Sequence, residues 1–420
     1  MQLVAYGSQD VYLTGNPQIT FFKVVYRRHT NFSVEAIEQT FNGTPDFGKK
    51  VSSTISRNGD LIYRMYLEAI LPSVDVSNAL VPDASNAHWV NYVGERLINY
   101  VEVEIGGQRI DKHYGEWLHI WNQLTLPVGH EQGYNRLIGN IPSLIKNSYN
   151  KYSINSTRLK IPLQFWFCRN PGLALPLIAL QYHEVKINVQ FEPLNSMSYP
   201  PNPVGGSYLQ GCSIWADYIF LDTDERRRFA QVSHEYLIEQ VQFSNALSVG
   251  QANATSSQHE LRFNHPVKEL VWLIDNSNNF SDFTQYVTCK DALLQLNGQD
   301  RFKRRSGDYF TKVQRYEHHS GCGRFLNSTD RSSTEDESGV LSATHVYSFA
   351  LKPEEHQPSG TCNFSRIDNA VLNLSYGTNL IGFPSGTLST TDSSTVVKVY
   401  AVNYNVLRIM SGMGGLAYSN

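Results

Sequence analysis

The stretch Ile105-Gly106-Gly107-Gln108-Arg109-Ile110, followed by Tyr114-Gly115-Glu116-Trp117-Leu118, occurs in similar form later in the chain. The later copy reads Leu296-Asn297-Gly298-Gln299-Asp300-Arg301-Phe302, followed by Ser306-Gly307-Asp308-Tyr309-Phe310. The Gly-Gln pairs are 298 − 107 = 191 residues apart, and the glycine-acidic-aromatic triplets are 307 − 115 = 192 apart. A near-constant offset of this kind is typical of an internal repeat.

A third match supports the repeat, because residues 214–218 resemble residues 399–404 with Tyr218 and Tyr404 offset by 186. Together the three matches predict a duplicated domain of about 190 residues. Each Gly-Gln pair has the position of a hairpin turn between two extended stretches. The alternation before it predicts inward-facing side chains at Val101, Val103, Ile105, Leu294 and Leu296.

The composition favours an all-β protein. Charged residues are only 17% of the chain while aromatics reach 12%, a balance that suits strands better than polar helices. Short helices are expected only at 114–124 and 224–232. Strands bounded by Gly, Pro, Asn or Asp are expected at 61–68, 98–105, 159–167, 185–191, 270–274, 292–296 and 396–406.

At 420 residues the chain is long enough for two domains. The acidic start and basic end of residues 222–232 suit a short surface helix between them. We therefore expect an N-terminal arm at 1–24, a first β-domain at 25–221, the linker helix at 222–232, a second β-domain at 233–410 and a tail at 411–420.

Four long polar insertions and the two chain ends are the expected contact regions. The insertions, at 127–157, 193–211, 318–339 and 377–394, are expected to form one decorated end of the molecule. Residues 1–20 and 411–420 are candidates for arms that become ordered only on a neighbouring subunit.

Charge and cysteine content restrict the function classes. Thirty-five Lys+Arg against 38 Asp+Glu disfavour a coat that wraps nucleic acid directly. The cysteines, Cys168, Cys212, Cys289, Cys322 and Cys362, are odd in number and widely spaced, which favours assembly in a reducing compartment. Residues 1–20 have no signal-peptide pattern, and the longest apolar stretch, 171–180, is half of a membrane span.

No motif in the sequence supports catalysis. Residues 43–50 approach a phosphate-binding loop, but Lys50 replaces the hydroxyl residue, Pro45 removes an N–H, and a strand is expected to follow. His318, His319 and Cys322 cluster without a second ligand pair, so a metal site there is disfavoured. Four His-Glu pairs, at His130, His183, His234 and His259, have no second His at zinc-protease spacing.

The remaining polar motifs are also weak. The basic runs 226–228 and 303–305 contain no interleaved aromatics, so a nucleic-acid site is disfavoured. The sequons at Asn253 and Asn327 do not by themselves indicate glycosylation. We nominate no catalytic, cofactor-binding or metal-binding residue and expect no enzyme activity.

Four stretches carry a family resemblance: residues 3–32, 57–61, 103–111 and 403–419. With them the chain resembles the major capsid proteins of nucleocytoplasmic large DNA viruses. The resemblance implies two tandem eight-stranded jelly rolls, which agrees with the duplication, and long loops that form outward towers.

The resemblance also implies a structural role in the virion. It implies a homotrimer with a pseudo-hexagonal outline that tiles an icosahedral shell and is assembled in the host cytoplasm. The expected partners are neighbouring capsomers, minor capsid and penton proteins, and an internal membrane reached through minor proteins, with no direct contact to nucleic acid.

Three alternatives stay open on the sequence. A scaffold protein that forms a temporary lattice on immature virions would share these features. A two-jelly-roll enzyme acting on glycans would share the fold class, which does not fix function. A lectin would use exposed aromatics, for which Trp89 and Tyr134 are the candidates.

Overall fold

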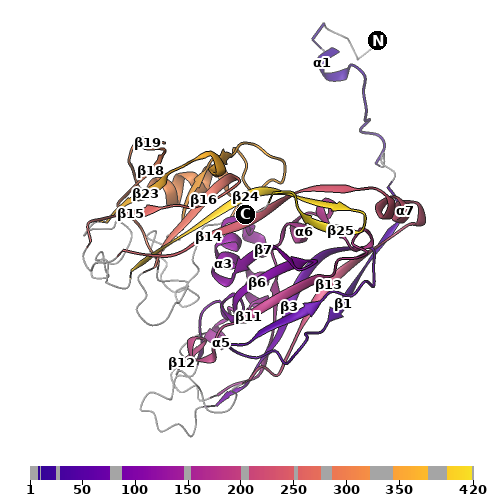
Figure 1. Ribbon diagram of the computed structural model, residues 1–420, viewed down its shortest axis with the longest axis horizontal. Helices are drawn as coiled ribbons and strands as arrows, with labels where there is room; N and C mark the ends of the chain where they lie inside the picture. Colours follow the sequence, from indigo (N-terminus) through magenta and orange to yellow (C-terminus); the bar gives the residue numbers. More distant parts are fainter. Residues whose placement is uncertain are drawn as a thin grey trace.

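The computed structural model describes residues 8–9, 11–24, 29–75, 88–145, 153–199, 208–249, 254–275, 286–321, 344–376 and 395–418. Two β-sandwiches built from antiparallel strands make up most of this part of the chain, and α3 lies between them (Figure 1). The fold is a double jelly roll, as the sequence predicts.

The first jelly roll consists of two facing sheets. One has the order β1-β13-β3-β10, with β9 also paired to β3, and the other has the order β2-β11-β6-β7. The strands of the first sheet are β1 (Phe32–Gln39), β13 (Gly211–Leu221), β3 (Leu61–Leu71), β10 (Leu175–Pro176) and β9 (Thr157–Pro162). Those of the second are β2 (Lys50–Thr54), β11 (Val185–Phe191), β6 (Ile98–Ile105) and β7 (Gln108–Tyr114).

The second jelly roll repeats this topology. Its larger sheet has β14 (His234–Ser248), β24 (Val396–Met410), β16 (Pro266–Asp275) and β17 (Tyr286–Val287) in that order. On that sheet β21 (His345–Ser348) and β22 (Cys362–Asn363) also pair with β16, and β25 (Met413–Leu416) pairs with β24. The facing sheet has β15 (Ser256–Glu260), β23 (Ala370–Ser375), β18 (Asp291–Leu296) and β19 (Gln299–Asp300) in order, with β20 (Arg305–Ser306) also on β18. The order β1-β13-β3 thus recurs as β14-β24-β16, which confirms the duplication.

The repeated glycines have the same structural roles in both rolls. Gly106 and Gly107 have φ of 58° and 85°, and Asn297 and Gly298 have φ of 52° and 76°, so both hairpins turn through two left-handed residues. Such a turn matches the twist of the strands it joins.

The next glycine of each copy makes a close backbone contact. A Cβ at Gly115 would lie 2.1 Å from the carbonyl oxygen of Ile98, and one at Gly307 would lie 2.0 Å from that of Cys289. Only glycine fits where a helix begins this close to a strand. The conserved spacing in the two copies therefore has a steric cause.

Each roll has its own apolar core, and the inward-facing residues are those the alternation predicts. Val101, Val103 and Ile105 are completely buried in the first core, while Leu294 is buried and Leu296 half-buried in the second. The seven predicted strands are present as β3, β6, β9, β11, β16, β18 and β24. One prediction was too long, because the strand predicted at 159–167 ends at Pro162 and α6 (Trp166–Arg169) follows.

Both predicted helices are present. The first is α3 (Gly115–Thr125), and the second is α7 (Thr223–Gln231), which is capped by the Asp222 carboxylate and has no buried residue. The linker helix therefore lies on the surface, as its polar sequence predicts. Among the described residues, no helix is long and apolar enough to cross a membrane.

The first predicted insertion is more ordered than expected. Residues 127–145 contain η1 (Val128–His130), α4 (Glu131–Leu137) and α5 (Pro142–Ile145), and Ile138, Leu144 and Ile145 are buried. The apolar residues within this polar stretch pack on the first roll, so it is not simply an exposed loop. Residues 146–152, 200–207, 322–339 and 377–394 of the insertions lie outside the described residues, as does Cys322.

Candidate assembly surfaces

The two rolls are joined by α3, which belongs to the first roll and packs on the outer face of the larger sheet of the second. Trp117, Trp121 and Leu124 recur at helical spacing on one side of α3. The shared apolar cluster comprises Trp117, Ile120, Trp121 and Leu124 of α3 with Val271, Leu273, Tyr400 and Val402 of β16 and β24. The rings of Trp117 and Tyr400 are 5.4 Å apart. This seam is a continuous apolar core within one chain.

The opposite side of α3 packs on its own roll. Leu118 belongs to the first core, His119 Nδ1 lies 2.7 Å from Glu95 Oε2, and the amide of Asn122 donates to Glu95 Oε1. Glu95 is on α2 (Val93–Leu97) and is buried. One side of α3 thus packs within the first roll, and the other side packs against the second roll at the seam.

The Glu116 carboxylate at the seam accepts three hydrogen bonds. Glu116 Oε1 accepts from the Tyr286 hydroxyl at 2.7 Å and from Lys398 Nζ at 2.9 Å, and Oε2 accepts from the Tyr400 hydroxyl at 2.6 Å. Lys398 also donates to Asp275 at 2.9 Å. Burial together with the Glu116 charge holds the pKa of Tyr286 and Tyr400 well above the ordinary value. Both tyrosines therefore remain neutral donors.

The second roll also completes the C-terminal end of α3. Gly321 N donates to the carbonyl oxygen of Leu124 at 2.7 Å, and the Ser320 hydroxyl donates to that of Thr125. These carbonyls have no partner within the helix itself. A Cβ at Gly321 would lie 2.2 Å from the carbonyl oxygen of Gln123, so the approach requires glycine.

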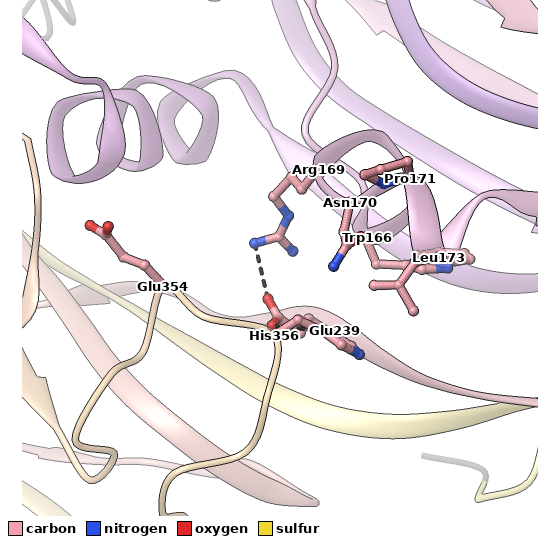
Figure 2. Close-up of a pocket in the computed structure, with 8 residues that line it drawn as sticks. All are labelled: Trp166, Arg169, Asn170, Pro171, Leu173, Glu239, Glu354 and His356. Atoms are coloured by element: carbon pink, nitrogen blue, oxygen red, sulfur yellow. Dashed lines mark ion pairs between the residues drawn. The ribbon is translucent and has the colours of Figure 1, made fainter. Parts of the chain in front are cut away.

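A second cluster of buried charges lines a cleft between the rolls (Figure 2). Arg169 of α6 lies 3.0 Å from Glu239 Oε2 on β14, and Lys268 Nζ of β16 lies 2.8 Å from Glu239 Oε1. Burial opposes ionisation of Glu239, but the two cations hold its pKa well below the ordinary value. The cleft is lined by Trp166, Arg169, Asn170, Pro171, Leu173, Glu239, Glu354 and His356.

His319 connects the segment after α8 (Gln314–His318) to the sheet. Its Nε2 lies 3.1 Å from Glu269 and its Nδ1 lies 3.0 Å from Glu354. Burial alone would lower the pKa of His319, but the two carboxylates outweigh it and raise the pKa to about 9. His319 is therefore a cation that neutralises buried carboxylates.

The predicted histidine and cysteine cluster does not form a site in the described chain. His318 Nδ1 contacts the carbonyl oxygen of Leu351, whereas His319 pairs with Glu269 and Glu354. No group of three or more His, Cys, Asp or Glu side chains suitable for a metal occurs among the described residues. Cys168, Cys212, Cys289 and Cys362 are free thiols.

The chain end is folded back, in contrast to the arm expected at 411–420. β25 pairs with β24, and Gly414 N lies 3.1 Å from His183 Nδ1 of the first roll. A Cβ at Gly414 would lie 2.6 Å from Leu180. The apolar contacts and the hairpin pairing fix residues 413–416 within the chain itself.

The N-terminal segment is the exposed end. It extends away from the body of the molecule and contains α1 (Val11–Thr14) (Figure 1). Tyr12, Phe21, Phe22 and Val24 are each more than 90% exposed. Exposed apolar side chains in this number indicate a contact region that the isolated chain does not cover.

The other sequence candidates have structural roles. β2 begins at Lys50, so a strand follows the loop-like stretch 43–50 as predicted, and Asp46 accepts from Phe47 N and Leu209 N. Trp89 is buried and Tyr134 is half-buried with its hydroxyl inside the chain, so the exposed aromatics expected for a lectin were wrong. Trp89 lies within the first core, and the Tyr134 hydroxyl donates to Glu95.

The histidine and arginine motifs also make ordinary contacts. His234 Nε2 lies 2.8 Å from the carbonyl oxygen of Phe229, and His259 Nε2 lies 2.7 Å from the Ser257 hydroxyl. In the first basic run, Arg226 pairs with Asp60 at 2.9 Å, and in the second, Arg305 lies over the ring of Tyr309.

Sequence reasoning missed the buried charged residues at and beside the cleft between the rolls. The signal was present in β16, where Lys268 and Glu269 interrupt an otherwise apolar strand. A buried charge requires a partner, but the partners Arg169, Glu239 and His319 are distant in sequence.

Comparison with known proteins shows that the chains similar to this one are major capsid proteins. A family model described as major capsid protein N-terminus matches residues 20–222, and one described as large eukaryotic DNA virus major capsid protein matches residues 225–415. The major capsid protein of Pyramimonas orientalis virus is 55% identical over 427 residues, covering 100% of this chain and 99% of that protein. That of Paramecium bursaria Chlorella virus 1 is 43% identical over 468 residues with the same coverage.

Solved structures agree. The crystal structure of PBCV-1 VP54 is 40% identical and has a TM-score of 0.77, covering 96% of this chain and 100% of that chain. The Faustovirus major capsid protein is 13% identical with a TM-score of 0.72, covering 96% and 94% of the two chains, and therefore shares the fold.

Proposed function

The chain belongs to the family of major capsid proteins of large eukaryotic DNA viruses and is a structural subunit of the virion shell. We propose that three copies of it form a homotrimeric, pseudo-hexagonal capsomer. The observation that carries the proposal is the repeated topology of two rolls joined side by side. Three such chains supply six similar units around one axis, and closed rings are the common outcome of repeated contacts.

The domain division follows the same logic. We propose an arm at 1–24, a first roll at 25–221, the linker helix at 222–232, a second roll at 233–410 and a tail at 411–420. Support comes from α7, which is exposed and separates strands that pair only within their own sheets in the described chain.

The N-terminal arm suits partners outside the trimer. Its exposed Phe21 and Phe22 favour contacts with minor capsid or penton proteins, and through minor proteins with an internal membrane. Contacts between capsomers would then be made by other surfaces, and assembly would take place in the host cytoplasm.

The role we propose does not involve catalysis. The carboxylates in the interdomain cleft are each neutralised by a buried cation, and the pKa values of Glu239 and Glu354 are lowered despite burial. A general acid at neutral pH requires the opposite shift.

Size-exclusion chromatography with light scattering on the full chain in reducing buffer tests the trimer. A mass of about 143 kDa, three times 47.6 kDa, with hexagonal particles in negative stain would support it. Removing residues 1–24 should leave the protein trimeric, with the mass lowered only by the residues removed. A folded 47.6 kDa monomer at all concentrations would overturn the capsomer.

A further inference from the structure

We propose that the helix of the second roll, η5 (Tyr309–Val313) continued by α8, docks on the outer face of the β1-β13-β3-β9 sheet of a neighbouring copy. The contact would repeat between chains what α3 does within one. The inference rests on the proposed trimer and specifies the surfaces that form it.

The second-roll helix packs on its own roll just as α3 does. With the offset of 192 residues, Leu118, His119 and Asn122 correspond to Phe310, Thr311 and Gln314. All six are buried. The inner face of the helix is therefore equivalent in both rolls, which fixes which face points outward.

The outward face of the second-roll helix keeps apolar residues at two of the seam positions, and these are uncovered. The seam residues Trp121 and Leu124 correspond to Val313 and Tyr316, which are 41% and 90% exposed. Both are large apolar side chains at helical spacing. Their equivalents in α3 form the core of the seam, where the helix packs on the outer face of a β-sheet. The structure itself thus shows that such a helix face binds a sheet.

The first roll has the matching sheet face. In the second roll Tyr400 of β24 lies opposite Val271 of β16, and both face α3. In the first roll Trp215 of β13 lies opposite Tyr66 of β3, and their rings stack 6.3 Å apart. The Tyr66–Trp215 pair thus has the place on the first-roll sheet that the Val271–Tyr400 pair has on the second-roll sheet.

A further observation indicates that this face is uncovered in the isolated chain. Phe32 and Val34 on the neighbouring strand β1 are 54% and 52% exposed. In Figure 1, β1, β13 and β3 form the outer side of the first roll.

Charged residues on the two proposed surfaces keep these surfaces soluble in water before the interface forms. Lys312 stands at the position of the buried Ile120 and is exposed. On the sheet, Glu38 and Asp217 flank Trp215 in the pairing register, with Arg64, Glu68 and Lys160 nearby on β3 and β9. Interfaces between separate subunits are typically more polar at their rim than cores are.

The geometry leads to a ring. A helix of one roll on the sheet of the next is a head-to-tail contact, and such contacts close when the rotation allows it. Three internal seams and three contacts between copies would then alternate around the capsomer. A second copy of this chain is the occupant to which the proposal commits.

The first test is a Val313→Asp, Tyr316→Asp double variant of the full chain, measured by size-exclusion chromatography with light scattering. At a concentration where the wild type has about 143 kDa, the variant should fall to 47.6 kDa. Tyr182→Asp is the matched control, because Tyr182 is 75% exposed but belongs to neither proposed surface, and it should remain trimeric. Unchanged circular dichroism would show that the monomeric variant is folded.

The second test locates the contact without disturbing it. A benzoylphenylalanine photo-crosslinker in place of Tyr316 should link to a second chain within residues 32–39, 61–71, 157–162 or 211–221, identified by peptide mass mapping. Crosslinks to other segments, or a trimeric double variant, would overturn this inference while leaving the proposed trimer intact. A wild type that is monomeric would instead overturn the proposed trimer, and this inference with it.

Discussion

The α3 helix and the second-roll helix, η5 with α8, are equivalent elements with opposite surroundings. Their inner faces are similar in burial, because each closes a jelly roll of the same topology. Their outer faces differ, with Trp117 and Trp121 buried at the seam and Val313 and Tyr316 exposed. The comparison teaches that the fold constrains one side of the repeated helix, and the neighbouring roll constrains the other.

The same contrast holds for charge. The internal seam pairs the half-buried Glu116 and Lys398, and the cleft buries Glu239 with Lys268. Removing one partner of a buried ion pair is costly, since the remaining charge stays desolvated. Such ion pairs suit a seam that stays closed within one chain. The exposed outer face of the second-roll helix has no buried ion pair in the described part of the chain.

The largest effect should come from the apolar part of the seam. Trp117→Ala should lower the free energy of unfolding by about 3–5 kcal/mol, because it removes a large buried ring. Tyr316→Ala, on the exposed outer face of the second-roll helix at the position equivalent to Leu124, should change it by less than about 0.5 kcal/mol in the monomer. Urea denaturation followed by fluorescence measures both, and similar losses would contradict the contrast between the two helices.

His319 should make the seam sensitive to alkaline pH. Its folded pKa of about 9 lies above the ordinary 6.5, so its contribution is fully present below pH 6.5 and is lost as pH rises to 9. The loss should be on the order of 3 kcal/mol. Unfolding at pH 6 and pH 9.5 tests this: His319→Gln should flatten the difference, whereas His130→Gln, which changes an exposed histidine, should preserve it.

A smaller effect is expected from the seam carboxylate. Glu116→Gln should cost about 1–3 kcal/mol, because a neutral amide cannot satisfy two tyrosine hydroxyls and Lys398 together. Glu235→Gln breaks an exposed pair with Arg408 and should cost about 0–1 kcal/mol. Equal losses in thermal unfolding would mean that the buried network adds no more than a surface pair.

The sequence by itself determined the duplication, because the repeated Gly-Gln turns and the glycines at 115 and 307 follow from local backbone geometry. It also determined most strands and the linker helix, since alternation and polarity act over neighbouring residues. It misjudged the strand after Pro162, where burial of Trp166 and Phe167 on a short helix overrides an apolar run that reads as extended.

Only the tertiary structure decided which faces meet. Glu116 and Lys398 are 282 residues apart in the sequence, and no local pattern links them. Other contacting residues are separated by comparable distances along the chain. The burial of Trp89, the bond of Tyr134 to Glu95 and the folded-back C-terminal hairpin likewise depend on packing against distant segments. Periodicity along the chain fixes which side of a strand or helix is apolar, but the choice of what covers that side belongs to the packing of whole domains.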